Sequence, residues 1–343
     1  MPLRSCIRVF VLLLTIAVVP KSVVAAGPDD DLVARAKQEG RVVVYFAGAT
    51  QRSNALTERF RAAYGISADF LRMGSDELPI RIMTEDRGGL NNADVILVPQ
   101  IQSGLLAEAG LLTAFKPPET GEMLASSFDP NGSWGTTAFL ETAGIAFNPE
   151  RLRSLGIKPP STWEDLARPE WRGRFGIASN DVEFYIALRK FYGKDRNEQL
   201  MRALAANQPR LLESHTQGLT MIVSGELLAM ASAYIPDAAD LKKKGSPIDY
   251  VMPTPTVLTL ACVALAKKPP HPNAARLFMR WWLSRSSQQW FSATFGVPSA
   301  RKDVKNDPEL LSPRVRYTAA GPGRSVEYSA DVRAFRTTFN LPG

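Results

Sequence analysis

The sequence predicts an α/β protein of two lobes, each built on a mainly parallel sheet with helices on its faces. Strand-like and helix-like segments alternate over residues 31–110, an order typical of parallel sheets covered by helices. After a loop around residues 131–133 and a long β-prone run, the alternation starts again near residue 161. About 317 residues follow a predicted N-terminal signal, which is too many for one ordinary hydrophobic core.

The first 26 residues have the layout of a cleavable secretory signal peptide. Arg4 and Arg8 form a short basic region, residues 9–19 are apolar, and the stretch closes on Ala25 and Ala26. The apolar run is shorter than the roughly 20 residues that cross a bilayer, which disfavours the alternative of a retained anchor. We therefore expect cleavage after Ala25 or Ala26 and a mature protein in the periplasm.

The charge and composition exclude several classes of protein. The formal net charge is +7, and loss of the predicted signal would remove three basic and no acidic residues, leaving +4. Because the basic residues are scattered rather than clustered, we expect no nucleic-acid partner. The chain also shows no low-complexity tract and no repeat of 20 to 50 residues, so a solenoid is excluded.

The first lobe is predicted from a series of short segments. Gly65 stands at the usual position after the end of the second predicted helix. The candidate strand at 42–46 is a continuous β-prone run, as expected where both faces of a sheet are covered. The expected helices and strands are a helix at 31–39, a strand at 42–46, a helix ending at 64, and strands at 66–71 and 93–98.

The second half repeats this order and then returns to the first lobe. Expected segments are a β-prone run at 136–147, a strand at 175–178, a helix at 182–191, a strand at 227–231 and a long strand at 257–265. We therefore assign residues 27–133 plus about 262–285 to lobe one and residues 134–261 to the crossover and lobe two. Residues 286–343 are expected to form C-terminal helices that pack on the lobes.

Residues that carry catalysis are scarce in this sequence. Cys262 lies inside the apolar run 257–265, where a small buried hydrophobe is the expected role, and the chain has only His215 and His271. No nucleophile elbow, zinc-binding H-E-x-x-H or phosphate-binding loop occurs. We therefore expect no enzyme activity and no cofactor.

Several stretches resemble the ferric-type, group-1 extracellular solute-binding proteins of bacterial ABC importers. The resemblance covers nearly the whole predicted mature chain and rests on the order and spacing of weak motifs: residues 40–45, 93–95, 160–174, 224–226, 270–275 and 297–298. It implies the type 2 periplasmic binding protein fold, with two or three crossover strands and a ligand in the cleft between the lobes. It also implies a monomer that delivers its ligand to an ABC permease and its ATPase subunit. A ligand-dependent receptor for a sensor kinase would share these features.

The candidate ligand site follows from where strands end. Ligands of open α/β sheets collect at the carboxyl ends of strands, beside helix N-termini that attract negative charge. The loops that meet this description contribute seven candidate ligand-binding residues: Thr50, Gln51, Arg52, Ser179, Asn180, Thr216 and Tyr234. Ordinary helix capping is the competing interpretation for Thr50, Ser179 and Thr216. His215 is assigned to a cap or the surface.

The same loops bear on the identity of the ligand. Ferric members of the family use adjacent tyrosines, whereas this sequence has only Tyr234 at the matching position. Arg52 would oppose a metal cation and favour a carboxylate or phosphoryl group. We therefore expect a small organic or phosphorylated anion, contacted by Arg52 and Tyr234 from opposite lobes. The alternative is ferric iron or a ferric chelate with Tyr234 as the metal ligand, and a neutral solute is a third possibility.

Overall fold

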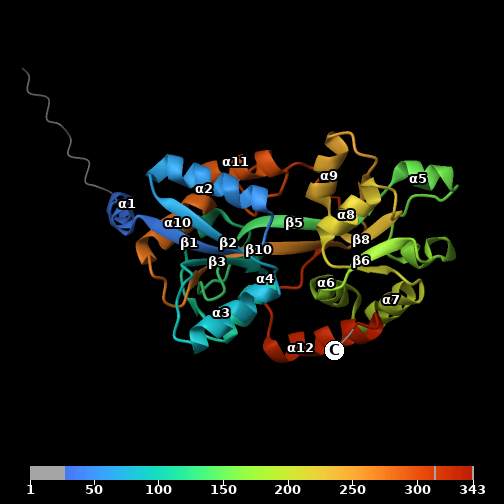
Figure 1. Cartoon of the computed structure of the whole chain (residues 1–343), viewed down its shortest axis with the longest axis horizontal. Helices are drawn as coiled ribbons and strands as arrows, with labels where there is room; N and C mark the ends of the chain where they lie inside the picture. The colour runs from blue at the N-terminus through green and yellow to red at the C-terminus, as the bar shows by residue number, and fades with distance from the viewer. Residues whose placement is uncertain (1–27, 313, 342–343) are drawn as a thin grey trace, which may run out of the picture.

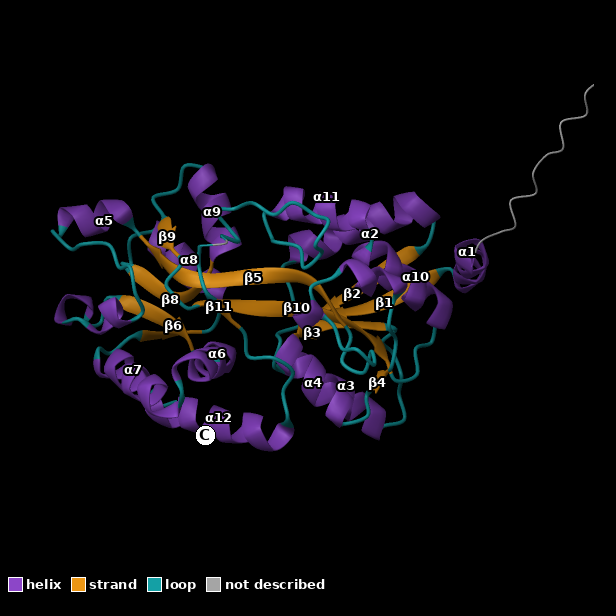
Figure 2. Ribbon diagram, turned by 180° about the vertical axis from the view of Figure 1, so that it is seen from behind, coloured by secondary structure: helices purple, strands orange, loops and turns teal. Residues whose placement is uncertain are grey.

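The computed structural model describes residues 28–312 and 314–341, so the predicted signal peptide lies outside the described residues. Within them, eleven strands form one sheet that runs along the whole molecule (Figure 1). Its main path has the order β2-β1-β3-β10-β5-β8-β6-β7, with β4, β9 and β11 attached at its sides. Helices cover both faces of each half (Figure 2). The predicted α/β class with two lobes is confirmed.

Lobe one contains the parallel strands β1, β2 and β3. The predicted strands agree with the observed ones to within two residues, and β1 and β3 are short, mostly apolar runs bounded by turn residues. The elements of this part of the chain are α1 (Pro28–Glu39), β1 (Arg41–Phe46), α2 (Thr50–Tyr64), β2 (Ser67–Arg72), α3 (Glu77–Arg87), β3 (Val95–Pro99), α4 (Gln100–Glu108), β4 (Leu112–Thr113), η1 (Pro118–Glu122) and η2 (Ala125–Ser127).

Two long strands carry the chain between the lobes. β5 (Thr136–Phe147) and β10 (Thr256–Ala266) pair antiparallel, with Glu141 opposite Thr259. At one end β10 pairs with β3, and at the other end β5 pairs with β8 and β9. All residues of β5 are buried, which explains its continuous apolar and small-residue sequence. The sheet is therefore continuous across the junction between the lobes.

Lobe two is arranged around β6, which lies parallel to β7 and β8. The chain reaches it through α5 (Pro149–Ser154), η3 (Glu164–Ala167) and η4 (Pro169–Trp171). Its further elements are β6 (Phe175–Ala178), α6 (Val182–Tyr192), α7 (Lys194–Ala206), β7 (Arg210–Leu212), α8 (His215–Val223), β8 (Ala229–Tyr234), α9 (Ile235–Lys243) and β9 (Asp249–Val251).

Each lobe has its own aromatic core. In lobe one, Trp282 and Phe278 of α10 (Pro272–Leu283) are fully buried with Phe60 of α2. In lobe two, Trp163 and Trp171 are fully buried, and the Trp163 indole donates to Pro255 O at 2.8 Å. Such clusters bury large apolar areas, which dominate the favourable free energy of folding. The described residues include no helix that is both long and apolar enough to cross a membrane.

The C-terminal part of the chain contacts both lobes. α11 (Arg285–Phe295) packs on α10 and β5, and β11 (Tyr317–Thr318) pairs with β10. α12 (Ser325–Thr338) then packs on α6 and α7 of lobe two (Figure 2). Just before it, Gly323 N donates to Ile101 O at 3.1 Å, and Ser325 N donates to Glu108 Oε2 at 2.6 Å. The segment before α12 is thus attached to α4 of lobe one.

This attachment requires a glycine in α4. A Cβ on Gly104 would lie 2.5 Å from Gly323 N, so the Gly104→Ala protein must shift one of two backbone segments. We expect the free energy of unfolding to fall by about 1–3 kcal/mol in denaturant titrations. Gly121→Ala is the control, because a Cβ on Gly121 meets no atom within 4 Å. Equal stability of the two variants would contradict the close approach.

Candidate functional site

A cleft lies between the two lobes, with the crossover strands as its floor. Phe139 and Glu141 of β5 and Thr259 and Ala261 of β10 line its base, and residues of both lobes form its walls. The empty space, including the open mouth, is about 980 Å³. The cavity itself is about 230 Å³, which limits the ligand to a small solute, since drug-sized ligands occupy pockets of roughly 300–1,000 Å³.

The starts of several helices face this cleft. Ala49 precedes α2, Gly74 and Ser75 precede α3, and Asn180 precedes α6, and each lines the pocket. From lobe two come also the first turn of α8, with Ser214, His215 and Thr216, and the residue before α9, Tyr234. Backbone N–H groups at helix starts carry partial positive charge and bind anions. These helix starts favour a negative group in the cleft, whereas three carboxylates that also line it act in the opposite direction.

Arg52 lies in the cleft wall, but its charge is already paired. The side chain is 5% exposed and donates to the buried Glu141 carboxylate and, at 3.2 Å, to Asp237 Oδ1 of α9. Burial by itself lowers the pKa of Arg52, and the Glu141 and Asp237 carboxylates more than reverse this, so that the pKa is raised. Arg52 therefore links α2 of lobe one to α9 of lobe two, and its guanidinium is shared between two carboxylates.

Glu141 is the buried partner in this ion pair. Burial raises its pKa to about 7, although the Arg52 guanidinium acts in the opposite direction. Its second oxygen, Oε2, has no hydrogen-bond partner within the part of the chain that the structure describes. A buried carboxylate is costly without a cation, so Glu141 depends on Arg52 for its charge.

Tyr234 and His215 form a stacked pair on the lobe-two wall. Their ring centroids are 4.1 Å apart with planes at 13°, and His215 Nε2 lies 3.4 Å from Asp181 Oδ2. Burial, together with the nearby carboxylates of Glu183 and Asp181, raises the pKa of the Tyr234 phenol well above its ordinary value. The neutral phenol, a hydrogen-bond donor, is therefore the favoured form in the absence of a bound cation.

Arg72, which the sequence analysis did not select, supplies the accessible positive charge of the cleft. It is the last residue of β2, it is exposed, and its Nε donates to Gly48 O at 2.8 Å. Among the described residues, no carboxylate forms an ion pair with it, so its terminal nitrogens are available. The signal that could have found it is the rule already applied to β1, since β2 ends at the same edge of the sheet.

The structure brings together four of the seven predicted ligand-binding residues. Arg52, Asn180, Thr216 and Tyr234 line the cleft. Three others do not: Thr50 is exposed at the start of α2, Gln51 lines a neighbouring pocket between α2 and α9, and Ser179 lines a pocket beside α12. Because successive residues of a helix start point in different directions, a loop identified in sequence does not specify which side chains reach the ligand.

Metal ligands other than tyrosine are not clustered in the part of the chain that the structure describes. Over the described ranges, no group of three or more His, Cys, Asp or Glu residues is placed to hold a metal ion.

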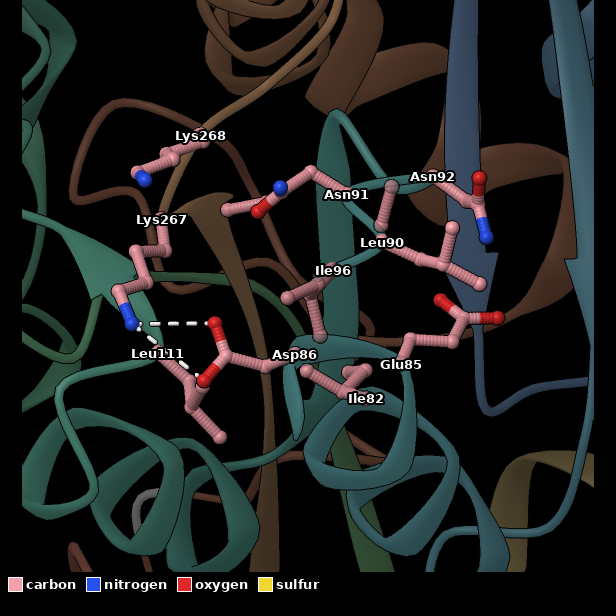
Figure 3. Close-up of a pocket in the computed structure, with 12 residues that line it drawn as sticks. Ile82, Glu85, Asp86, Leu90, Asn91, Asn92, Ile96, Leu111, Lys267 and Lys268 are labelled. Atoms are coloured by element: carbon pink, nitrogen blue, oxygen red, sulfur yellow. Dashed lines mark hydrogen bonds and ion pairs between the residues drawn. The ribbon is translucent and has the colours of Figure 1, made fainter. Parts of the chain in front are cut away.

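A smaller pocket elsewhere in lobe one does not have the position expected of a ligand site (Figure 3). It lies at the amino end of β3, where Lys267 Nζ pairs with Asp86 Oδ1 at 3.0 Å, and strand carboxyl ends are the usual ligand sites of such sheets.

Glu183, at the start of α6, makes the stability of the molecule depend on pH. Burial raises its pKa to about 8, with a smaller opposing effect from a Thr259 hydrogen bond and further increases from Asp181 and Asp76. The folded protein thus keeps a proton that the unfolded chain releases near its ordinary value of 4.5. This contribution to stability is complete below that value and is lost as the pH rises through about 8.

We therefore expect the Glu183→Gln protein, which resembles the protonated form, to lose less stability with rising pH. Between about pH 5.5 and about pH 8.5 the wild type should lose roughly 1–3 kcal/mol more than the variant in denaturant titrations. Glu58→Gln, on the exposed side of α2, serves as the control and should follow the wild type. Parallel pH profiles for wild type and Glu183→Gln would contradict the assignment.

The chain is similar in sequence to proteins named for iron uptake or for Fe(3+) binding. It is 28% identical over 163 residues to iron uptake protein A1 of Synechocystis sp., covering 46% of this chain and 42% of that protein. It is 25% identical over 170 residues to an Fe(3+)-binding periplasmic protein of Serratia marcescens, covering 48% and 49%. The matched segments thus span about half or less of these relatives.

Solved structures share the fold at low identity. The periplasmic binding protein AfuA of Actinobacillus pleuropneumoniae, with fructose-6-phosphate bound, gives a TM-score of 0.79 at 23% identity and covers 89% of this chain and 100% of that one. Iron-bound HitA of Pseudomonas aeruginosa gives 0.72 at 20%, covering 86% and 99%. The family described as bacterial extracellular solute-binding protein matches residues 91–318, which is more than half of the chain. The chain therefore belongs to the bacterial extracellular solute-binding proteins.

Proposed function

We propose that this protein is the periplasmic solute-binding component of an ABC importer and that its ligand is a small organic or phosphorylated anion. The observation that carries the proposal is the convergence of helix starts from both lobes on one cleft that also holds the unpaired Arg72. The permease and ATPase subunits of the importer would be its partners, and the protein would act as a monomer.

The distribution of charge in the cleft supports an anion. Each helix start contributes about 0.3–1 kcal/mol toward binding a negative group, and up to ~2 kcal/mol where partly buried. Arg72 adds a full charge at the mouth, and Arg52 within the wall is shared between the Glu141 and Asp237 carboxylates. An anion therefore meets donors on both lobes, and closure of the lobes around it would strengthen these contacts.

Ferric iron is the second candidate, favoured by the names of the relatives and by the position of Tyr234 in the cleft. Direct iron binding would have to deprotonate a phenol whose pKa is raised by burial and nearby carboxylates. It would also place the metal near the cationic Arg52, whose charge interacts with Tyr234. Both features make iron the less favoured ligand. Proteins crystallised with iron and with fructose-6-phosphate share this fold, so the fold itself does not select between them.

Catalysis is not part of the proposal. Cys262, the thiol of lobe one, is fully buried in β10, and burial raises its pKa to about 12. Such a thiol is a poor nucleophile, because the thiolate is the reactive form. A binding protein should show ligand-dependent thermal stabilisation without turnover of the ligand.

Arg72→Ala should weaken anion binding while leaving the fold intact. Hydrogen bonds to charged groups contribute about 1.5–3 kcal/mol, and because Arg72 is exposed we expect the lower end, a loss of roughly tenfold in affinity. Calorimetric titration with the best ligand from a thermal-shift screen of sugar phosphates, phosphonates, carboxylates and ferric citrate measures this. Arg61→Ala, an exposed substitution at the far end of α2, should bind normally. A tyrosinate-to-iron absorption band that Tyr234→Phe removes would instead establish the iron alternative.

Arg52→Ala should reduce stability, because it leaves the Glu141 carboxylate buried without a cation. Breaking a buried pair in this way costs about 3–5 kcal/mol. The loss should be smaller at about pH 5 than at about pH 8, since protonation of Glu141 removes the uncompensated charge. Denaturant titrations of wild type and variant at both pH values test this. If the variant is as stable as the wild type at the higher pH, Glu141 does not depend on Arg52.

A further inference from the structure

A second compartment adjoins the cleft on the side of α12. It lies among α3, α4, α6 and α12, with an empty space of about 1130 Å³ including its mouth. Asn180 lines both this compartment and the cleft, and Asp76 of the compartment follows directly on Ser75 of the cleft. The two spaces are therefore neighbours, separated by Asp76 of lobe one and Asn180 of lobe two.

The inner wall of this compartment carries hydrogen-bonding groups: the Gln102 amide, the Tyr328 phenol and the Asp76 carboxyl group. Gln102 is 6% exposed, and its Nε2 donates to Asp76 Oδ1 at 3.2 Å. Burial raises the pKa of Asp76, with hydrogen bonds from Gln102, Asn180 and Tyr328 acting in the opposite direction. The other amide atom, Gln102 Oε1, is buried and has no hydrogen-bond partner among residues 28–312 and 314–341. A buried acceptor without a partner costs free energy unless a ligand or water satisfies it.

The remaining walls are mostly apolar. Leu105 of α4, Val182 of α6 and Val332 of α12 line the space, together with the exposed Arg336. Apolar walls around a few fixed donors and acceptors are typical of sites for small organic ligands. Amide, phenol and carboxyl groups form hydrogen bonds with the hydroxyl groups of a ligand. The aliphatic walls can pack against the carbon skeleton of the same ligand.

We propose that this compartment is a second subsite of the cleft and that it holds a neutral, hydroxylated part of the ligand. The inference rests on the proposed function, in which the anionic group lies against the helix starts and Arg72. It narrows the ligand class to a phosphorylated or carboxylated polyol or sugar and excludes a bare inorganic anion as the transported solute. Gln102 and Tyr328 are then residues that determine specificity.

The test compares inorganic phosphate, glycerol 3-phosphate and fructose-6-phosphate as probes in calorimetric titrations. We expect wild-type affinity to rise at least tenfold from inorganic phosphate to the best extended probe. Val332→Trp fills the compartment and should abolish that gain while leaving the affinity for inorganic phosphate unchanged. Arg333→Trp is the matched control, because it places the same side chain on an exposed position of α12. It should bind like the wild type.

Gln102→Met provides a second test if Val332→Trp is unstable. It removes the amide at similar size and should reduce the gain from the extended probe severalfold, again without an effect on inorganic phosphate. Equal affinity for all three probes in the wild type would overturn the subsite, as would unchanged binding of the extended probe by Val332→Trp. If no anion binds the wild type at all, the proposed function fails and the subsite fails with it.

Discussion

The antiparallel pairing of β5 with β10 is the constraint on which the rest of the structure depends. These two strands are the floor of the cleft and the connection between the lobes at the same time. Because side chains alternate along a strand, Phe139, Glu141, Thr259 and Ala261 face the cleft, whereas Leu140, Leu258 and Leu260 line the opposite face. Any change in the angle between the lobes must therefore be absorbed by strands that also position ligand-facing groups.

Glu141 shows how this arrangement determines the charge of the site. A carboxylate in the middle of a buried strand would ordinarily be unfavourable, and Arg52 of α2 compensates it. The same guanidinium reaches Asp237 of α9. One cation thus connects α2 of lobe one, the crossover strand β5 and α9 of lobe two. The charge left for a ligand then comes from helix starts and from Arg72 rather than from Arg52.

Much of the fold could be predicted from the sequence, because the buried strands are short apolar runs with clear boundaries. The region of the site could also be predicted, since strand carboxyl ends and helix starts are local features. The pairing of Arg52 could not, because Glu141 is 89 residues away in the sequence and pairs with it only through the tertiary fold. The side compartment was missed for the same reason: its walls come from α3, α4, α6 and α12. Arg72, by contrast, was within reach of the strand-end rule.

Polar contacts beside the cleft join the two lobes, and their strength bears on how a ligand acts. Arg52 meets Asp237, whose side chain is 39% exposed, and Asp76 interacts with the exposed Asn180. Polar contacts that water can reach contribute little to stability, roughly 0–1 kcal/mol each. They orient the lobes without holding them closed. A ligand that contacts both lobes must then supply most of the free energy of closure, so that the closed shape reports an occupied cleft.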